Sequence, residues 1–166
     1  MRLLGAGLIW TSLIFVATVY SSELKRRVII LSETSLMISE MKIQLEYLNM
    51  PLYDMIDNLS MKDSLAEIDF LRQCRELLSQ GRDFPLAWKT SVLNAMHYKM
   101  NEKTALLQLG SNLGTSNKEN QIEMLQLHKI AFDEFIKTAK DKEAKYGKMS
   151  ITLAALTGCM FFVTVI

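Results

Sequence analysis

The chain has 166 residues, a length typical of one domain, with 49% hydrophobic and 22% charged residues. These fractions exclude an intrinsically disordered chain. Nineteen Lys and Arg against eighteen Asp and Glu leave a net charge of +1, which argues against a nucleic-acid binder, because such proteins normally carry a basic excess. The two cysteines, Cys74 and Cys159, lie too far apart to indicate a disulfide framework or a metal cluster.

The two ends of the chain are strongly apolar, since residues 3–20 and 149–166 are runs of 18 residues without a charge. A helix of this length spans about 27 Å, close to the roughly 30 Å hydrocarbon core of a bilayer. We therefore predict transmembrane helices at residues 1–22 and 149–166. A cleaved signal peptide is less favoured, because no clean cleavage site follows Tyr20. A buried C-terminal core helix is also less favoured, because the run is apolar on every face.

Positively charged residues flank both apolar runs on the side of the central segment. They are Lys25, Arg26 and Arg27 after the first run, and Lys142, Lys145 and Lys148 before the second. Cytoplasmic flanks of membrane helices carry an excess of Lys and Arg, so both ends independently predict residues 23–148 as a cytoplasmic domain. We expect these cations also to attract anionic lipid head groups.

The central segment shows helical periodicity throughout. Apolar side chains recur at helical spacing along the first predicted helix, at Leu31, Ile38, Met41, Leu45 and Leu48. Pro51 ends this helix, and a second, short helix is predicted to about residue 58. The later boundaries are predicted from caps, prolines and glycines. They are Asp63 or Ser64 to Gly81, Asp83 to about Tyr98, Asn101 to near Gly114, and Ser116 or Asn117 onward into the second membrane span.

The predicted fold class is all-α. We expect an antiparallel bundle of about six cytoplasmic helices, the first and last of which continue into the N- and C-terminal transmembrane helices. No run alternates strictly enough to predict a strand. The domain organisation is therefore a membrane helix, a helical domain over residues 23–148, and a second membrane helix.

Residues that could carry chemistry are few and scattered. His97 and His128 have no Cys or second His at helical ligand spacing, which favours ordinary histidines over a metal site. The carboxylates of Asp133 and Glu134 occupy positions where a helix needs a solvated face. No glycine-rich phosphate-binding motif is present. The sequence predicts no catalytic residue, no cofactor and no metal ligand, so it gives little support to an enzyme.

Residues 109–117 form an unusual stretch, with two glycines four residues apart and a polar tail. Gly110 and Gly114 would let a neighbouring backbone approach closely, and Asn117 can cap the following helix. A tight turn between helices is the simpler interpretation. A partner-contact surface that also includes Gln121 is compatible with it.

The order and spacing of several short motifs are distinctive. They are Gly-x-x-Leu-Gly-x-x-Asn-x-x-x-Gln at residues 110–121, Glu46-x-x-x-x-Pro51-Leu52, Ala87-Trp88 and Lys145-Tyr146-Gly147-Lys148-Met149. Together with the length and the two apolar ends, they resemble the stage III sporulation protein AB family of endospore-forming bacteria over essentially the whole chain. Asn117 stands where the family commonly has Asp, which preserves the helix cap but removes a charge.

This resemblance implies a non-enzymatic component of the machine built across the mother-cell and forespore membranes during engulfment, located in the mother-cell membrane. The soluble domain would be similar to the cytoplasmic helical domain of platform proteins in type II secretion and type IV pilus systems, and would dock a secretion-type ATPase. The implied partners are this cytoplasmic ATPase, other stage III sporulation proteins and membrane lipids, and self-association remains open.

Two other classes of function also remain open. The first is a membrane-bound regulator or sensor with a helical signalling domain, although neither predicted span contains a charged residue. The second is a membrane enzyme, although the basic residues near the membrane ends have no His or Cys beside them.

Overall fold

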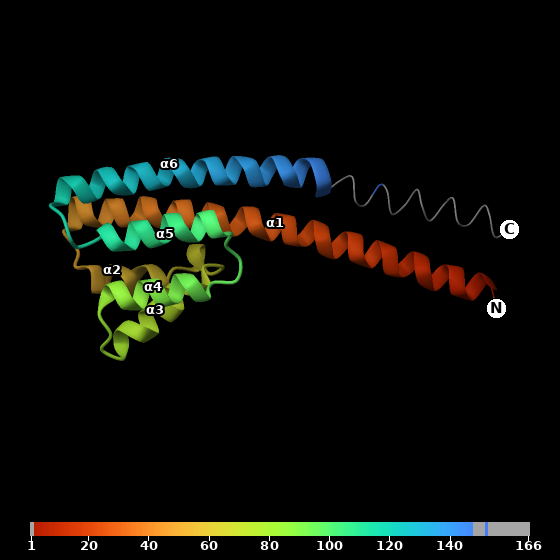
Figure 1. The fold of residues 1–166 in the computed structure, drawn as a ribbon, viewed down its shortest axis with the longest axis horizontal. Helices are drawn as coiled ribbons and strands as arrows, with labels where there is room; N and C mark the ends of the chain where they lie inside the picture. The colour runs from red at the N-terminus through yellow and green to blue at the C-terminus, as the bar shows by residue number, and fades with distance from the viewer. Residues whose placement is uncertain (1, 148–151, 153–166) are drawn as a thin grey trace. The chain divides into compact units, whose positions relative to one another are not determined.

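The computed structural model describes the backbone of residues 2–147 and 152, and the side chains of residues 15, 16, 18–146 and 152. This part of the chain is all-α and contains no strand. The elements are α1 (Arg2–Leu48), α2 (Leu52–Ser60), the 3₁₀ turn η1 (Asp63–Leu65), α3 (Asp69–Ser79), α4 (Phe84–Asn94), α5 (Met100–Asn112), α6 (Lys118–Lys142) and the π-helical turn η2 (Glu143–Gly147) (Figure 1). Over the described residues, the prediction of an all-α fold with about six helices is confirmed.

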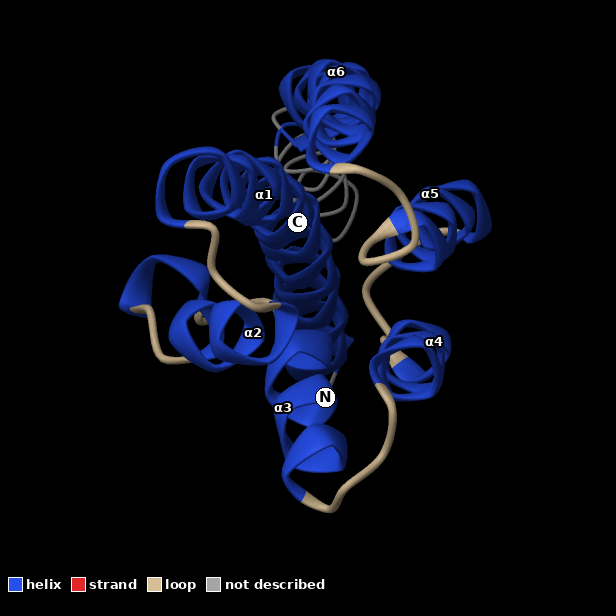
Figure 2. Cartoon of the chain, turned by 90° about the vertical axis from the view of Figure 1, so that its left-hand side faces the viewer, coloured by secondary structure: helices blue, strands red, loops and turns tan. Residues whose placement is uncertain are grey.

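The chain divides into two compact units. Unit 1 comprises Met1–Val28 and Lys137–Ile166, and unit 2 comprises Ile29–Ile136. Unit 2 holds the second part of α1, all of α2 to α5, and most of α6. In the end-on view of Figure 2 these helices follow one another around the unit in chain order, so that α6 returns to the side of α1.

The core of unit 2 draws on every helix. On α1, Met37, Ile38 and Met41 are fully buried. Large buried side chains of the other elements are Met55, Ile56, Leu59, Ile68, Phe70, Trp88 and Phe132. Full burial of a large apolar side chain contributes about 1.5–3 kcal/mol, so this cluster is the main source of stability in the unit.

Helices α1 and α6 run antiparallel and are joined along their length in unit 2 (Figure 1). Ser35 Oγ donates a hydrogen bond to Asp133 Oδ1 (2.7 Å), and Lys118 Nζ donates to the backbone oxygen of Glu46 (2.7 Å). Since early residues of α1 lie opposite late residues of α6, the chain enters and leaves unit 2 at the same end. We call this the exit end.

The apolar face of α1 differs in part from the predicted stripe. Leu31, Ile38 and Met41 are buried as predicted, but Leu45 is only half-buried and Leu48 is exposed. Gln44 takes a buried position instead, at 4% exposure. The last turn of α1 has no core to cover it, because the chain turns away at Pro51 to begin α2.

The connection between α2 and α3 corrects one prediction. The sequence predicts a helix that begins at Asp63 or Ser64, but these residues form η1, and α3 begins only at Asp69. The backbone N–H of Glu67, which such a helix would need for its own ladder, donates instead to Glu33 Oε2 on α1 (2.9 Å). Burial raises the pKa of the Glu33 carboxyl, partly opposed by this hydrogen bond.

The end of α4 corrects a second prediction, since the helix stops at Asn94 and not near Tyr98. The Tyr98 hydroxyl lies 2.7 Å from Thr34 Oγ1 of α1, and Thr34 Oγ1 donates to the backbone oxygen of Ile30. A hydroxyl has a single proton, so Tyr98 is the donor to Thr34. Burial raises the pKa of Tyr98.

The start of α5 corrects a third prediction. The sequence predicts Asn101 as the cap, but the N-cap is Lys99, whose backbone N–H donates to Glu102 Oε2 (2.8 Å). Glu102 is buried, at 2% exposure, and occupies the third helical position, as in a capping box.

Within the described residues, no helix is both long enough and apolar enough to cross a bilayer. The side chains of residues 3–14 and 17, which make up most of the first predicted span, lie outside the described part of the chain, as does the second span apart from residue 152. Both transmembrane helices therefore stay predictions.

Candidate functional site

Gly110 lies in α5, and its surroundings explain the first glycine of the predicted motif. A Cβ atom at this position would overlap Cγ, Cδ1 and Nε1 of the Trp88 ring. The indole Nε1 donates to the backbone oxygen of Leu106 (2.7 Å), one turn earlier in α5. Gly110 therefore lets the α4 indole pack directly on the backbone of α5, which is an internal packing role.

Three further residues of the motif, Gly114, Asn117 and Gln121, come together in the turn between α5 and α6. Gly114 has a left-handed backbone (φ +79°), and its N–H donates to Gln121 Oε1 (3.0 Å). Gln121 Nε2 donates in turn to the backbone oxygen of Ser116 (2.6 Å). Asn117 Oδ1 accepts from the backbone N–H of Asn120 (3.2 Å), which caps α6. Gly114 and Asn117 are exposed, and a partner contact at this turn stays a prediction.

An open groove of about 300 Å³ lies between α1 and α6 on the surface of unit 2. It is lined by Ile38, Ser39, Lys42, Ile43, Glu46 and Tyr47 of α1, and by Leu125, Gln126 and Lys129 of α6. Ile43 and Tyr47 are 49% and 73% exposed, respectively. Sequence reasoning assigned them no role. The sequence does contain an indication of this surface, because Ile43 and Tyr47 are large hydrophobic residues that lie outside the predicted apolar stripe of the first helix.

Helix α1 is apolar on two opposite faces within unit 2. Met37 and Met41 belong to its buried face, whereas Ile29, Leu36 and Ile43, spaced seven residues apart, are each at least 40% exposed on the outer face. A surface helix normally carries polar residues on the face opposite to the core. In the part of the chain that the structure describes, nothing covers this outer face.

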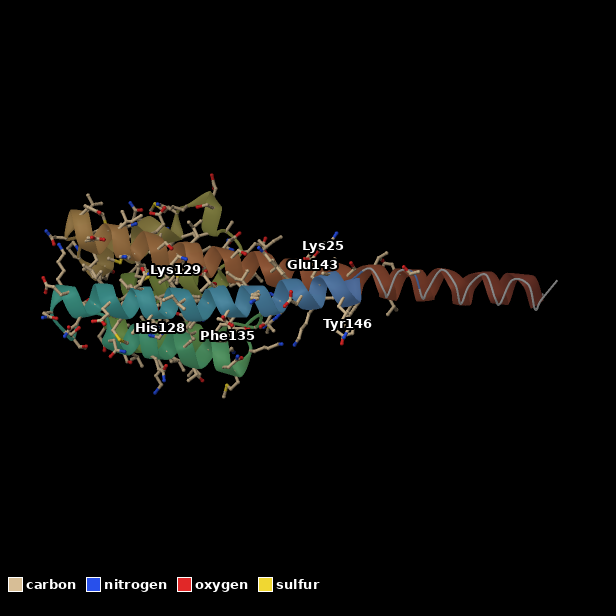
Figure 3. The ribbon with its side chains drawn as sticks, turned by 90° about the horizontal axis from the view of Figure 1, so that it is seen from above. Lys25, His128, Lys129, Phe135, Glu143 and Tyr146 are labelled. Atoms are coloured by element: carbon tan, nitrogen blue, oxygen red, sulfur yellow. The ribbon has the colours of Figure 1, made fainter. Side chains whose placement is uncertain are left out.

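Three charged residues line the groove, and two of them, Lys42 and Glu46, lie one helical turn apart on half-buried side chains of α1. Lys42 Nζ donates to the neutral Gln126 Oε1 (3.0 Å). Among the described residues, neither Lys42 nor Glu46 has an oppositely charged partner at ion-pair distance. By contrast, Lys129, which points toward α1 in Figure 3, pairs with Asp133 at 2.7 Å, and this hydrogen bond lowers the pKa of Asp133.

The side chains with catalytic or metal-binding potential are dispersed in the described part of the chain. His97 Nε2 lies 3.9 Å from Asp69 Oδ2, while His128 is on α6. No three His, Cys, Asp or Glu side chains among the described residues are grouped so that they could hold a metal ion. Cys74 is buried, which raises the pKa of its thiol to about 12, and Cys159 lies outside the described residues. The groove between α1 and α6, and not a cluster of catalytic or metal-binding side chains, is therefore the candidate functional site in the described part of the chain.

We predict that the stability of the chain depends on pH because His128 is buried. Its side chain is 8% exposed, and burial lowers its pKa below the usual 6.5. As the pH falls through 6.5, the unfolded chain takes up the proton first, so the free energy of unfolding should decrease below this pH. The free energy of unfolding of the original chain, relative to that of His128→Gln, should decrease by up to about 1.4 kcal/mol per pH unit below 6.5.

Chemical denaturation of both proteins between pH 8 and 5, followed by circular dichroism, measures this difference. Glu33 and Asp133 are present in both proteins, so their contribution to the pH dependence cancels in the comparison. A difference that stays constant over this pH range would show that folding leaves the pKa of His128 unchanged.

The predicted membrane-flanking cations belong to unit 1. Lys25, Arg26, Lys142 and Lys145 are exposed, Arg27 is half-buried, and Lys148 lies outside the described residues. Lys145 Nζ lies 5.4 Å from the centre of the Tyr146 ring, within cation–π range. Figure 3 shows Lys25 on α1 and Tyr146 in η2. Contacts of these cations with lipid head groups stay predictions.

Comparison with known proteins identifies the family. Neither the curated proteins nor the solved structures contain a match to the chain. The family model for stage III sporulation protein AB matches residues 2–166, which is almost the entire chain and includes the groove and the turn after α5. The chain therefore belongs to the stage III sporulation protein AB family, a family of sporulation proteins.

Proposed function

We propose that the chain is a non-enzymatic, membrane-anchored platform component of the transport complex between mother cell and forespore, and that its central domain docks a secretion-type ATPase. The exit end of unit 2 supports this proposal. The hydrogen bond between Ser35 and Asp133 holds the beginning of the unit beside its end. A domain whose two connections leave side by side can be attached to one membrane through two neighbouring helices.

In this proposal the domain acts by binding. The end of unit 2 opposite to the exit end carries the turn between α5 and α6, with Gly114, Asn117 and Gln121, next to the end of α1. Attachment through the exit end would point this opposite end into the cytoplasm, where an ATPase could reach it. Membrane association would also fix the orientation of the domain, which lowers the entropic cost of binding to an oriented partner.

The test is binding between the full chain in detergent micelles and the purified secretion-type ATPase of the same sporulation complex. We expect saturable binding by microscale thermophoresis, and co-elution of both proteins in size-exclusion chromatography. The control is an unrelated protein with two membrane helices in the same detergent, which should not bind. Absence of binding by a folded, membrane-inserted chain would contradict the proposal.

A further inference from the structure

We propose that the groove between α1 and α6 is the docking site for an amphipathic helix of the secretion-type ATPase. This inference rests on the proposed function and names the surface through which it works. The groove lies wholly within unit 2 and combines exposed apolar side chains with two charges that lack a partner among the described residues.

The shape and apolar lining favour a helix as the occupant. The groove runs between two antiparallel helices, and its volume of about 300 Å³ accommodates a few side chains. A helix laid along such a groove inserts its side chains at positions i, i+3 or i+4 and i+7, while its backbone stays at the rim. Ile38 and Leu125 line the groove but are fully buried, so the exposed apolar contacts come from Ile43, at 49% exposure, and Tyr47, at 73% exposure.

The charges specify the chemistry of that helix. Lys42 and Glu46 are half-buried, so an occupant that removed their remaining water without replacing it would pay a desolvation penalty. A helix with a carboxylate at the level of Lys42 and a cation one turn away, at the level of Glu46, would satisfy both. Complementary charges of this kind also fix the direction in which a helix lies.

A second copy of the chain is the less favoured occupant. Two copies could satisfy Lys42 with Glu46 of the other copy, but only if their α1 helices ran antiparallel. Copies anchored in one membrane through the same exit end would run parallel, so this reciprocal pairing would not form. The position of the groove fits a cytoplasmic partner, because Glu46 and Tyr47 lie beside the last residue of α1, away from the exit end.

The experiment uses the full chain in detergent micelles and the purified ATPase. Ile43→Asp should weaken binding of the ATPase at least roughly tenfold, because it places a charge among the apolar contacts of the groove. Leu127→Asp is the matched control. Leu127 is also an exposed apolar residue, at 55%, but it lies on α6 outside the groove lining, so this variant should bind like the original chain.

A charge exchange tests the direction of the helix. The double variant Lys42→Glu with Glu46→Lys keeps the net charge but reverses the order of the two charges, and it should also weaken binding several-fold. A photo-crosslinking amino acid in place of Tyr47 should capture the ATPase. The same amino acid in place of Leu86, an exposed residue of α4 that does not line the groove, should not. Circular dichroism should show that all variants are folded.

The possible outcomes separate the two proposals. Binding that is insensitive to Ile43→Asp and to the charge exchange, with no crosslink from position 47, would overturn the groove as the docking site but leave the platform function standing. Crosslinks from position 47 that join two copies of the chain would also overturn it, in favour of self-association. Failure of the original chain to bind the ATPase at all would overturn the proposed function itself.

Discussion

Gly110→Ala is expected to destabilise unit 2 by about 3 kcal/mol, because the added methyl group overlaps the Trp88 ring. The ring cannot move away easily. It is 1% exposed, it makes an edge-to-face contact with Phe70 at 5.3 Å, and its Nε1 is bound to the backbone of Leu106. Helix propensity alone would make Gly110→Ala stabilising by about 1 kcal/mol. A loss of stability would therefore come from the overlap with Trp88. Hydrogen exchange of the α4 and α5 amides in the full chain measures it.

Two comparisons isolate this overlap. Gly81→Ala introduces a methyl group at a left-handed residue (φ +83°) with no atom within 4 Å, so it should cost only the backbone strain of about 1–2 kcal/mol. In a Trp88→Ala background, Gly110→Ala should become neutral or stabilising, because the methyl group then partly fills the cavity. A stabilising effect of Gly110→Ala with Trp88 in place would contradict the packing described for α4 and α5.

The helix boundaries that follow from local signals were predictable from the sequence. Pro51 separates α1 from α2 as predicted, and the predicted start at Asp83 is followed by Pro85 in the first turn of α4. Gly81 adopts a left-handed conformation just after α3, the geometry for which it was assigned as the end of that helix. In each case the cause is a conformational restriction, or freedom, of the residue itself.

The boundaries that were wrong depend on contacts with distant residues. Before α3, the backbone N–H of Glu67 donates a hydrogen bond to the side chain of Glu33, which is 34 residues earlier in the chain. The residues after α4 place Tyr98 against Thr34, which is 64 residues earlier. Local caps such as Ser64 give way to these tertiary contacts. A buried hydrogen-bonding group without a partner, such as the Tyr98 hydroxyl, would cost about 1–3 kcal/mol.

The candidate site shows the same division. The turn at Gly114 and Asn117 could be predicted, since the residues that close it lie within seven positions of one another in the sequence. The role of Gly110 could not, because it depends on the position of Trp88 in the preceding helix. The groove was not predicted either, because it exists only once α6 has returned to the side of α1.

Phe132→Ala is expected to destabilise unit 2 by about 4 kcal/mol, in the range for loss of a buried aromatic ring. Phe132 is fully buried on α6 and makes an edge-to-face contact with Phe135 at 5.4 Å. The amides of α6 should lose protection from hydrogen exchange, because Phe132 helps to hold this helix in the bundle. Leu127→Ala is the control on the same helix, and its 55% exposed side chain should change stability by less than about 0.5 kcal/mol.

The result bears on function because α6 forms one wall of the groove and one side of the exit end. If Phe132→Ala loosens α6, the binding of the ATPase that we propose should weaken even though Phe132 does not line the groove. Leu127→Ala should leave both the exchange rates and the binding unchanged. Equal exchange rates in the two variants would show that α6 is held by its polar contacts, such as that of Ser35 with Asp133, and not by its buried aromatic side chain.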